Sequence, residues 1–169
     1  KISEKQAVDT VHAALDLGLT FIDTAESYNN SERVIGKALQ NRRSQVFLAS
    51  KFSGLDHSRQ HIESALEASL KALRTDFIDL YQIHQPSIDW PIEQTMGHLL
   101  RLKEMGKIRY IGVSNFSSEQ IVAALKWGPI HSSQPRYSLL FRESEDSVLP
   151  CCFENGLGVM AFSALAKGL

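Results

Sequence analysis

The sequence of 169 residues has few cysteines, no excess of charge of either sign and no long apolar run. Its two cysteines, Cys151 and Cys152, are neighbours. That geometry disfavours an ordinary disulfide and is typical of a reducing compartment, so we expect free, packed thiols. No run approaches the ~18 apolar residues of a membrane span, and residues 1–14 lack the apolar stretch of a secretory signal. These absences favour a cytoplasmic protein with no membrane partner.

The charges are balanced, with 18 Lys and Arg against 19 Asp and Glu and a net charge of −1. A nucleic-acid-binding face needs an excess of positive charge, so we expect no nucleic-acid partner. A composition of 43% hydrophobic and 22% charged residues is enough to form one core. We therefore expect a single domain over residues 1–169 that binds a small neutral or weakly polar molecule. The sequence indicates no particular oligomeric state.

Short apolar runs alternate with helical patterns along the whole chain. We expect strands to start near Thr20, Val46, Phe77, Ile108, His131 and Gly158. A helix in every gap is typical of repeated right-handed βαβ units, and so of a parallel sheet. We therefore predict an α/β fold, a (β/α)8 TIM barrel with about six βα units present. A doubly wound open sheet is the alternative, but the G-x-G-x-x-A match at residues 156–161 leads into a strand and not into a helix.

Local signals mark several element ends. Two Ser-x-x-Gln sequences, at residues 3–6 and 117–120, predict capping boxes at the starts of helices. Residues 143–154 are expected to form one helix, which Pro150 strains. The basic pair at residues 42–43 is interpreted as part of a solvated loop. The last expected strand runs over residues 156–162.

Residues with chemical potential gather at the expected carboxyl ends of the strands. In strand order they are Asp23, Lys51, His84, Ser114 with Asn115, Gln134, and Phe162 with Ser163. Each one alone has a simpler interpretation, such as a solvated strand end, a core histidine or a helix cap. In a parallel barrel, however, all of these ends meet on the rim where active sites are built. Taken together, the residues favour a functional site.

Tyr28, in the loop after the first strand, joins this group. We expect Asp23 to hold Lys51 as an ion pair, Lys51 to lie beside the Tyr28 phenol, and His84 to approach from the next strand. A phenol has an ordinary pKa of about 10 and is a poor acid near neutrality unless a neighbouring charge stabilises the phenolate. An ammonium at about 4 Å would lower that pKa by up to about three units. Together these residues predict a site in which Tyr28 protonates a substrate oxygen as negative charge develops on it.

The ordered segments FIDTAESY, ASK, DLYQIH, GVSNF and QPRYSL resemble the aldo-keto reductases. The resemblance runs from the first helix to the end of the chain. It implies a catalytic tetrad of Asp23, Tyr28, Lys51 and His84. It also implies reduction of a small aldehyde or ketone to an alcohol with NADP(H), and the choice of NADP(H) over NAD(H) rests on the resemblance alone.

The same resemblance implies a nicotinamide site. Ser114, Asn115 and Gln134 would hydrogen-bond the carboxamide, and Phe162, with Ser163 beside it, would stack on the ring where the family often has tyrosine. Family barrels have eight strands. We therefore expect this sequence to lack the opening strand and the last strand with its cofactor-phosphate loop.

Two other functions fit parts of the sequence. One is an NADPH-binding regulatory subunit that resembles the cytoplasmic β subunits of potassium channels. The other is a metal site at His57 and His61, whose i, i+4 spacing could place two imidazoles on one helical face. The segment HSRQH lacks the glutamate of a zinc protease and has no apparent third ligand. We therefore expect no metal site and interpret the two histidines as an exposed helix start.

Overall fold

The computed structural model describes residues 2–166 and 168. One parallel sheet has the order β1-β2-β3-β4-β5-β6, so each strand pairs with its neighbours in sequence. The strands are β1 (Phe21–Asp23), β2 (Phe47–Phe52), β3 (Ile78–Ile83), β4 (Ile108–Ser114), β5 (Ser132–Gln134) and β6 (Gly158–Val159). The helices are α1 (Glu4–Asp16), α2 (Ser31–Ala38), α3 (Arg59–Leu73), α4 (Ile92–Glu104), α5 (Ser118–Leu125) and α6 (Val148–Glu154), with 3-10 turns η1 (Arg43–Gln45) and η2 (Glu143–Glu145). The predicted alternation of strands and helices is confirmed.

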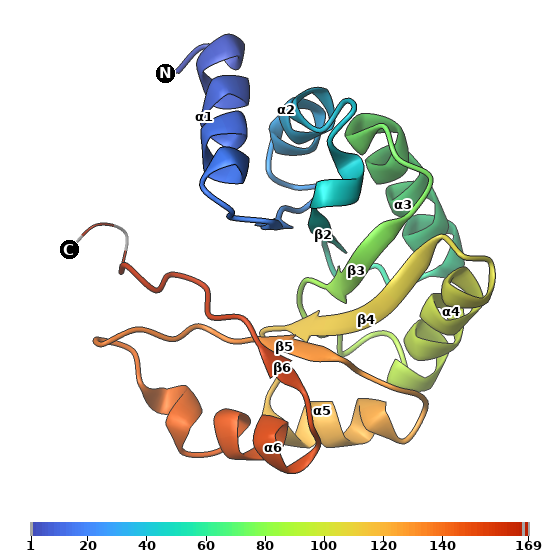
Figure 1. Cartoon of the computed structure of the whole chain (residues 1–169). Helices are drawn as coiled ribbons and strands as arrows, with labels where there is room; N and C mark the ends of the chain where they lie inside the picture. Colours follow the sequence, from blue (N-terminus) through green and yellow to red (C-terminus); the bar gives the residue numbers. More distant parts are fainter. Residues whose placement is uncertain (1, 167, 169) are drawn as a thin grey trace.

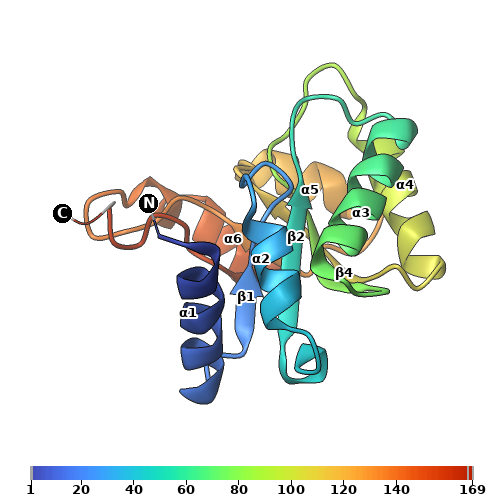
Figure 2. The ribbon, with the colours of Figure 1, turned by 90° about the horizontal axis from the view of Figure 1, so that it is seen from above.

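The sheet curls into a half-barrel with the helices along its outer side (Figure 1). Its two edge strands, β1 and β6, border the open side of the half-barrel. Figure 2 shows the loops that follow β2 and β3 projecting from one end of the sheet. This arrangement confirms the expected partial (β/α)8 fold. Within the described ranges, no helix is both long and apolar enough to span a bilayer.

The main core fills the layer between the outer face of the sheet and the helices. Phe52 and Tyr81 from the strands pack in one cluster with Leu66 of α3 and Leu99 of α4, and all four side chains are buried. Successive strand residues point to opposite faces, so the residues next to Phe52 and Tyr81 point inward. Strand pairing places two of these, Lys51 and Gln82, in register. The core thus directs polar side chains to the inner face.

Both capping boxes are confirmed, at the starts of α1 and α5. Residues 143–154 do not form one helix, because η2 ends at Glu145 and α6 begins only at Val148. Pro150 lies in the first turn of α6, where its missing N–H group removes no intrahelical hydrogen bond. The helix is therefore not strained by the proline; it starts just before it. The last strand is also shorter than expected and ends at Val159.

Arg43 is not a solvated loop residue, and that interpretation is wrong. Its guanidinium donates to Asp79 Oδ2 at 2.7 Å and lies 4.6 Å from the centroid of the Phe77 ring. Arg109 donates to Asp79 Oδ1 at 3.0 Å from the neighbouring strand. Asp79 is only 3% exposed, so its charge needs these partners. The three side chains tie η1 to β3 and β4.

The expected free thiols are confirmed. Cys151 and Cys152 lie in α6, and both are buried and unpaired with each other. Burial raises the pKa of each thiol, which keeps both protonated near neutral pH. They contribute to the packing of α6 against the sheet.

Candidate active site

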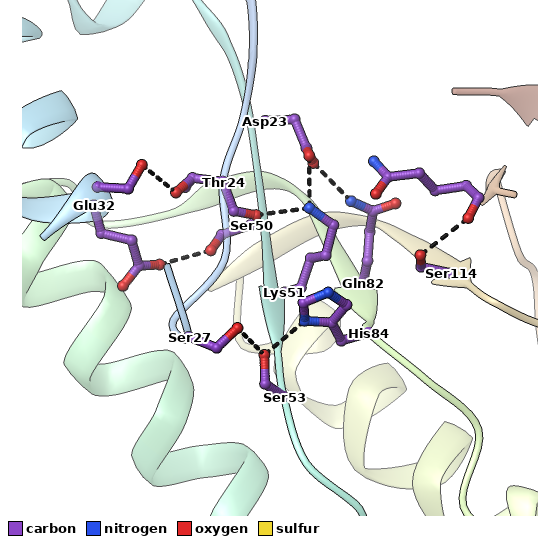
Figure 3. A network of polar contacts seen from close by, with 12 residues as sticks. Asp23, Thr24, Ser27, Glu32, Ser50, Lys51, Ser53, Gln82, His84 and Ser114 are labelled. Atoms are coloured by element: carbon purple, nitrogen blue, oxygen red, sulfur yellow. Dashed lines mark hydrogen bonds and ion pairs between the residues drawn. The ribbon is translucent and has the colours of Figure 1, made fainter. Parts of the chain in front are cut away.

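The carboxyl ends of β1 and β2 meet in an ion pair. Lys51 is fully buried, and its Nζ atom lies 2.6 Å from Asp23 Oδ2 and donates to the Thr24 carbonyl oxygen at 2.9 Å. From β3, Gln82 Nε2 donates to Asp23 Oδ1 at 3.0 Å (Figure 3). Both carboxylate oxygens therefore accept a hydrogen bond, one from Lys51 of β2 and one from Gln82 of β3, while the ammonium donates to two consecutive residues at the end of β1.

The buried site disfavours the charge on Lys51. Burial lowers the pKa of Lys51, and the Asp23 carboxylate opposes this by raising it, with burial the larger effect. A charged amine without a partner would be costly at such a position. Asp23 is therefore the group that allows an ammonium to exist at this end of the sheet.

Tyr28 lies in the loop between β1 and α2 and faces the ion pair. Lys51 Nζ is 5.2 Å from the centroid of the Tyr28 ring, and the ring packs edge-on against the His84 imidazole with centroids 5.7 Å apart. The ammonium donates to Asp23 and Thr24, and no hydrogen bond joins it to the phenol within residues 2–166. The structure thus brings the four residues of the expected tetrad together.

The pKa of Tyr28 moves in the direction opposite to the one expected from the sequence. Partial burial of the phenol raises its pKa, and the Asp23 carboxylate raises it further. The lysine does not reverse this effect, because its ammonium donates to Asp23 and Thr24 and not to the phenol. The phenol is therefore protonated throughout the neutral range.

His84 follows β3 directly, and contacts behind it fix its ring. Its Nδ1 atom lies 2.7 Å from Ser53 Oγ, which lies 3.0 Å from Ser27 Oγ (Figure 3). Asn115 Nδ2 donates to the His84 carbonyl oxygen at 2.9 Å. Burial lowers the pKa of His84, Lys51 lowers it further, and Asp23 acts in the opposite direction. The imidazole is therefore neutral near pH 7, and none of the described residues hydrogen-bonds its Nε2 atom.

Ser114, Asn115 and Gln134 lie together at the ends of β4 and β5. Ser114 Oγ donates to the Gln134 carbonyl oxygen at 3.0 Å, and Asn115 Nδ2 lies 3.2 Å from Ser114 Oγ. Asn115 has a φ of 61°, in the left-handed region that asparagine tolerates better than most residues. Gln134 is buried, yet its side-chain amide hydrogen-bonds to no described residue. The ends of β4 and β5 thus present the Gln134 side-chain amide, which is free to hydrogen-bond a ligand.

Phe162 and Ser163 lie beyond the last strand and not at its end. Phe162 forms an isolated parallel bridge with Arg136 and is half-buried. Ser163 has a φ of 55°, which turns the chain directly after the bridge. Neither residue hydrogen-bonds the tetrad within the described part of the chain.

His57 and His61 both pack edge-on against the Phe52 ring but have different hydrogen-bond partners. His57 is 1% exposed, and its Nδ1 atom lies 3.2 Å from Thr95 Oγ1 of α4. His61 Nε2 donates to the Ser53 carbonyl oxygen at 2.9 Å. The interpretation as an exposed helix start is wrong for His57, because α4 packs over it. The described residues contain no group of three or more His, Cys, Asp or Glu placed to hold a metal ion.

Sequence reasoning missed Gln82, Ser53 and Ser27. Gln82 had a detectable signal, since it lies two residues before His84 on a strand whose side chains alternate between faces. The two serines lie in loops without periodicity, so only the folded chain places them behind the imidazole.

Comparison with known proteins gives a consistent result. The model of the aldo/keto reductase family matches residues 1–169. The chain is 44% identical over 179 residues to aldo-keto reductase YhdN of Bacillus subtilis, covering 98% of the chain and 54% of that protein. The thermostable aldo-keto reductase Tm1743, solved with the inhibitor epalrestat, superimposes with a TM-score of 0.94 at 36% identity. The superposition covers 98% of this chain and 63% of the Tm1743 chain.

An aldo/keto reductase from Klebsiella pneumoniae, solved with NADP and acetate, gives a TM-score of 0.91 at 36% identity, over 97% of this chain and 59% of that one. The chain spans about half the length of the curated relatives that it matches.

Proposed function

The chain belongs to the aldo/keto reductase family, and on that premise we propose that it reduces a small aldehyde or ketone to an alcohol with NADPH. The observation that supports this most directly is the meeting of Asp23, Lys51, Tyr28 and His84 at one end of the sheet. The K. pneumoniae neighbours solved with NADP and with NADPH support the choice of cofactor.

Tyr28 is the general acid in this proposal. Its raised pKa keeps the hydroxyl proton in place until negative charge develops on the substrate oxygen. Once the proton has left, the phenolate lies near the Lys51 ammonium, which is 5.2 Å from the ring centroid. The lysine thus acts on a charge that is absent from the ground state, which is the requirement for catalysis.

His84 orients the carbonyl group. Its ring meets the Tyr28 ring edge-on, and its Nε2 atom is the imidazole nitrogen left free by the contact at Nδ1. A neutral imidazole with a proton on Nε2 can donate to the same oxygen that receives the tyrosine proton. The two donors together hold the carbonyl in one orientation.

The residues at the ends of β4 and β5 fit a nicotinamide carboxamide. The buried Gln134 amide has both donor and acceptor capacity, and Asn115 Oδ1 accepts no hydrogen bond from the described residues. In this proposal Ser114, Asn115 and Gln134 hydrogen-bond the nicotinamide carboxamide, and the nicotinamide ring lies beside Phe162 and Ser163. NADPH bound there would supply the hydride.

Steady-state oxidation of NADPH by the full-length protein with a panel of aldehydes and ketones tests the proposal. Turnover that depends on Tyr28 supports a reductase. Tight NADPH binding without turnover of any carbonyl compound would instead support the regulatory binding subunit.

Two further properties complete the proposal. Residues 1–169 belong to a single barrel domain, which the one continuous sheet supports. The protein acts in the cytoplasm, which the two buried free thiols support.

A further inference from the structure

Ser53, the first residue after β2, is held at every polar atom. Its backbone N–H group donates to Glu26 Oε1, and its carbonyl oxygen accepts from His61 Nε2 at 2.9 Å. Its hydroxyl oxygen lies 2.7 Å from His84 Nδ1 and 3.0 Å from Ser27 Oγ. The backbone contacts come from the β1–α2 loop and from the first turn of α3. They fix the position from which the hydroxyl meets the imidazole.

The contact with His84 Nδ1 decides which hydrogen bond the other ring nitrogen can make. A neutral imidazole carries one N–H group, so one nitrogen donates and the other accepts. The lowered pKa of His84 makes the neutral form the one present near pH 7. A carbonyl oxygen only accepts hydrogen bonds, so Nε2 can bind it only if Nε2 carries the proton. Nδ1 must then be the acceptor.

We propose that Ser53 is a positioning residue that donates its hydroxyl proton to His84 Nδ1 and so holds the imidazole as the Nε2–H tautomer. Ser53 has only one hydroxyl proton, so its 3.0 Å contact with Ser27 Oγ is then made by the Ser27 hydroxyl, which can rotate to donate. Ser27 lies exposed in its loop, where water can satisfy its remaining lone pairs. If His84 Nδ1 instead carried the proton and donated it to Ser53, Nε2 would direct a lone pair at the lone pairs of a carbonyl oxygen. The inference rests on the proposed function, because it supplies the donor that His84 needs in that role.

Nitrogen-15 NMR of the histidine imidazoles in the full-length protein tests the assignment, because it separates protonated from unprotonated ring nitrogens without turnover. The wild type should show a protonated Nε2 at His84. Ser53→Ala should raise the Nδ1–H fraction, and Ser53→Thr, which keeps the hydroxyl, should restore the wild-type tautomer. The alanine variant should also lose roughly tenfold in kcat, the effect of one hydrogen bond, with NADPH affinity unchanged within about twofold.

Ser27→Ala is the matched control, because it removes the neighbouring hydroxyl and leaves His84 as the acceptor for Ser53. It should keep the Nε2–H tautomer. The proposal is overturned if Ser53→Ala keeps the wild-type tautomer, if Ser53→Thr shows Nδ1–H, or if Ser27→Ala shifts the tautomer as much as Ser53→Ala does. Should the alanine variant fail to fold, the threonine variant decides alone. A wild type that reduces no carbonyl compound would refute the proposed function, while the tautomer would still report on Ser53.

Discussion

The Lys51 ammonium lies 2.6 Å from the Asp23 carboxylate, so residues from two neighbouring strands form one hydrogen-bonded ion pair. Gln82 occupies the second carboxylate oxygen at 3.0 Å. The two charges act in opposite directions on His84, where Lys51 lowers the pKa and Asp23 raises it. Removing either charge should therefore change the titration of the neighbouring rings in a direction that depends on which charge remains.

Tyr28→Phe should lower carbonyl reduction by about 10²- to 10⁴-fold, the usual contribution of a general acid. NADPH affinity should stay within a few-fold, since the phenol acts on the substrate. Steady-state kinetics and fluorescence titration measure the two effects. Tyr110→Phe, in the amino-terminal half of β4, is the matched control and should retain activity. Near wild-type turnover of Tyr28→Phe would mean that another group supplies the proton.

Lys51→Met should raise the pKa of His84, and Asp23→Asn should lower it. The sign follows from the contacts, because Lys51 lowers this pKa and Asp23 raises it. In the wild type the folded-state pKa lies below the unfolded value, so the stability contributed by neutral His84 is present above the unfolded pKa and is lost as pH falls below it. NMR titration of the imidazole in both variants measures the shifts. Shifts of the same sign in the two variants would contradict the assigned charges.

Gln134→Ala should weaken NADPH binding and hydride transfer more than it affects the melting temperature. The Gln134 amide has no hydrogen bond to another described residue, so its loss leaves no protein group unpaired. Asn115→Ala is an informative comparison, because it also removes the donor to the His84 carbonyl oxygen and should lower the melting temperature as well. Equal losses of stability and activity in Gln134→Ala would indicate a structural role.

Gly36→Ala should destabilise the protein by about 1–3 kcal/mol, the usual cost of overpacking. A Cβ atom at Gly36 would lie 2.3 Å from the Ala72 carbonyl oxygen, so α2 and α3 would have to separate. Gly97→Ala in α4 is the control, because a Cβ there meets nothing within 4 Å. It should stabilise the protein by up to about 1 kcal/mol through helix propensity. Urea unfolding measures the free energy of unfolding of both variants. An unchanged value for Gly36→Ala would show that α2 and α3 can move apart at little cost.

Asp79→Asn should destabilise the protein by roughly 3 kcal/mol, because it removes a buried charge that two arginines share. Arg43 would lose its partner in a position that is largely shielded from water. Asp9→Asn breaks an exposed i, i+4 pair with Lys5 and should change stability little. Similar unfolding midpoints for the two variants would argue against a structural role for the Asp79 cluster.

Local patterns in the sequence were enough to predict the order of strands and helices and both capping boxes. They also placed Asp23, Lys51 and His84 to within one residue of the carboxyl ends of their strands. These features depend on side-chain periodicity and on residues only a few positions apart, and the amino-acid sequence alone contains both. Even the meeting of the tetrad follows from them, because parallel strands place their carboxyl ends at one edge.

Features that depend on distances between separate segments were not predictable in this way. The raised pKa of Tyr28 depends on the burial of the phenol and on its distance from Asp23, and the burial of His57 depends on the packing of α4. The contact between Ser53 and His84 joins two loops that are 31 residues apart. Electrostatic and hydrogen-bond energies vary with separations of a few ångströms, and those separations are set only when the helices and strands pack together.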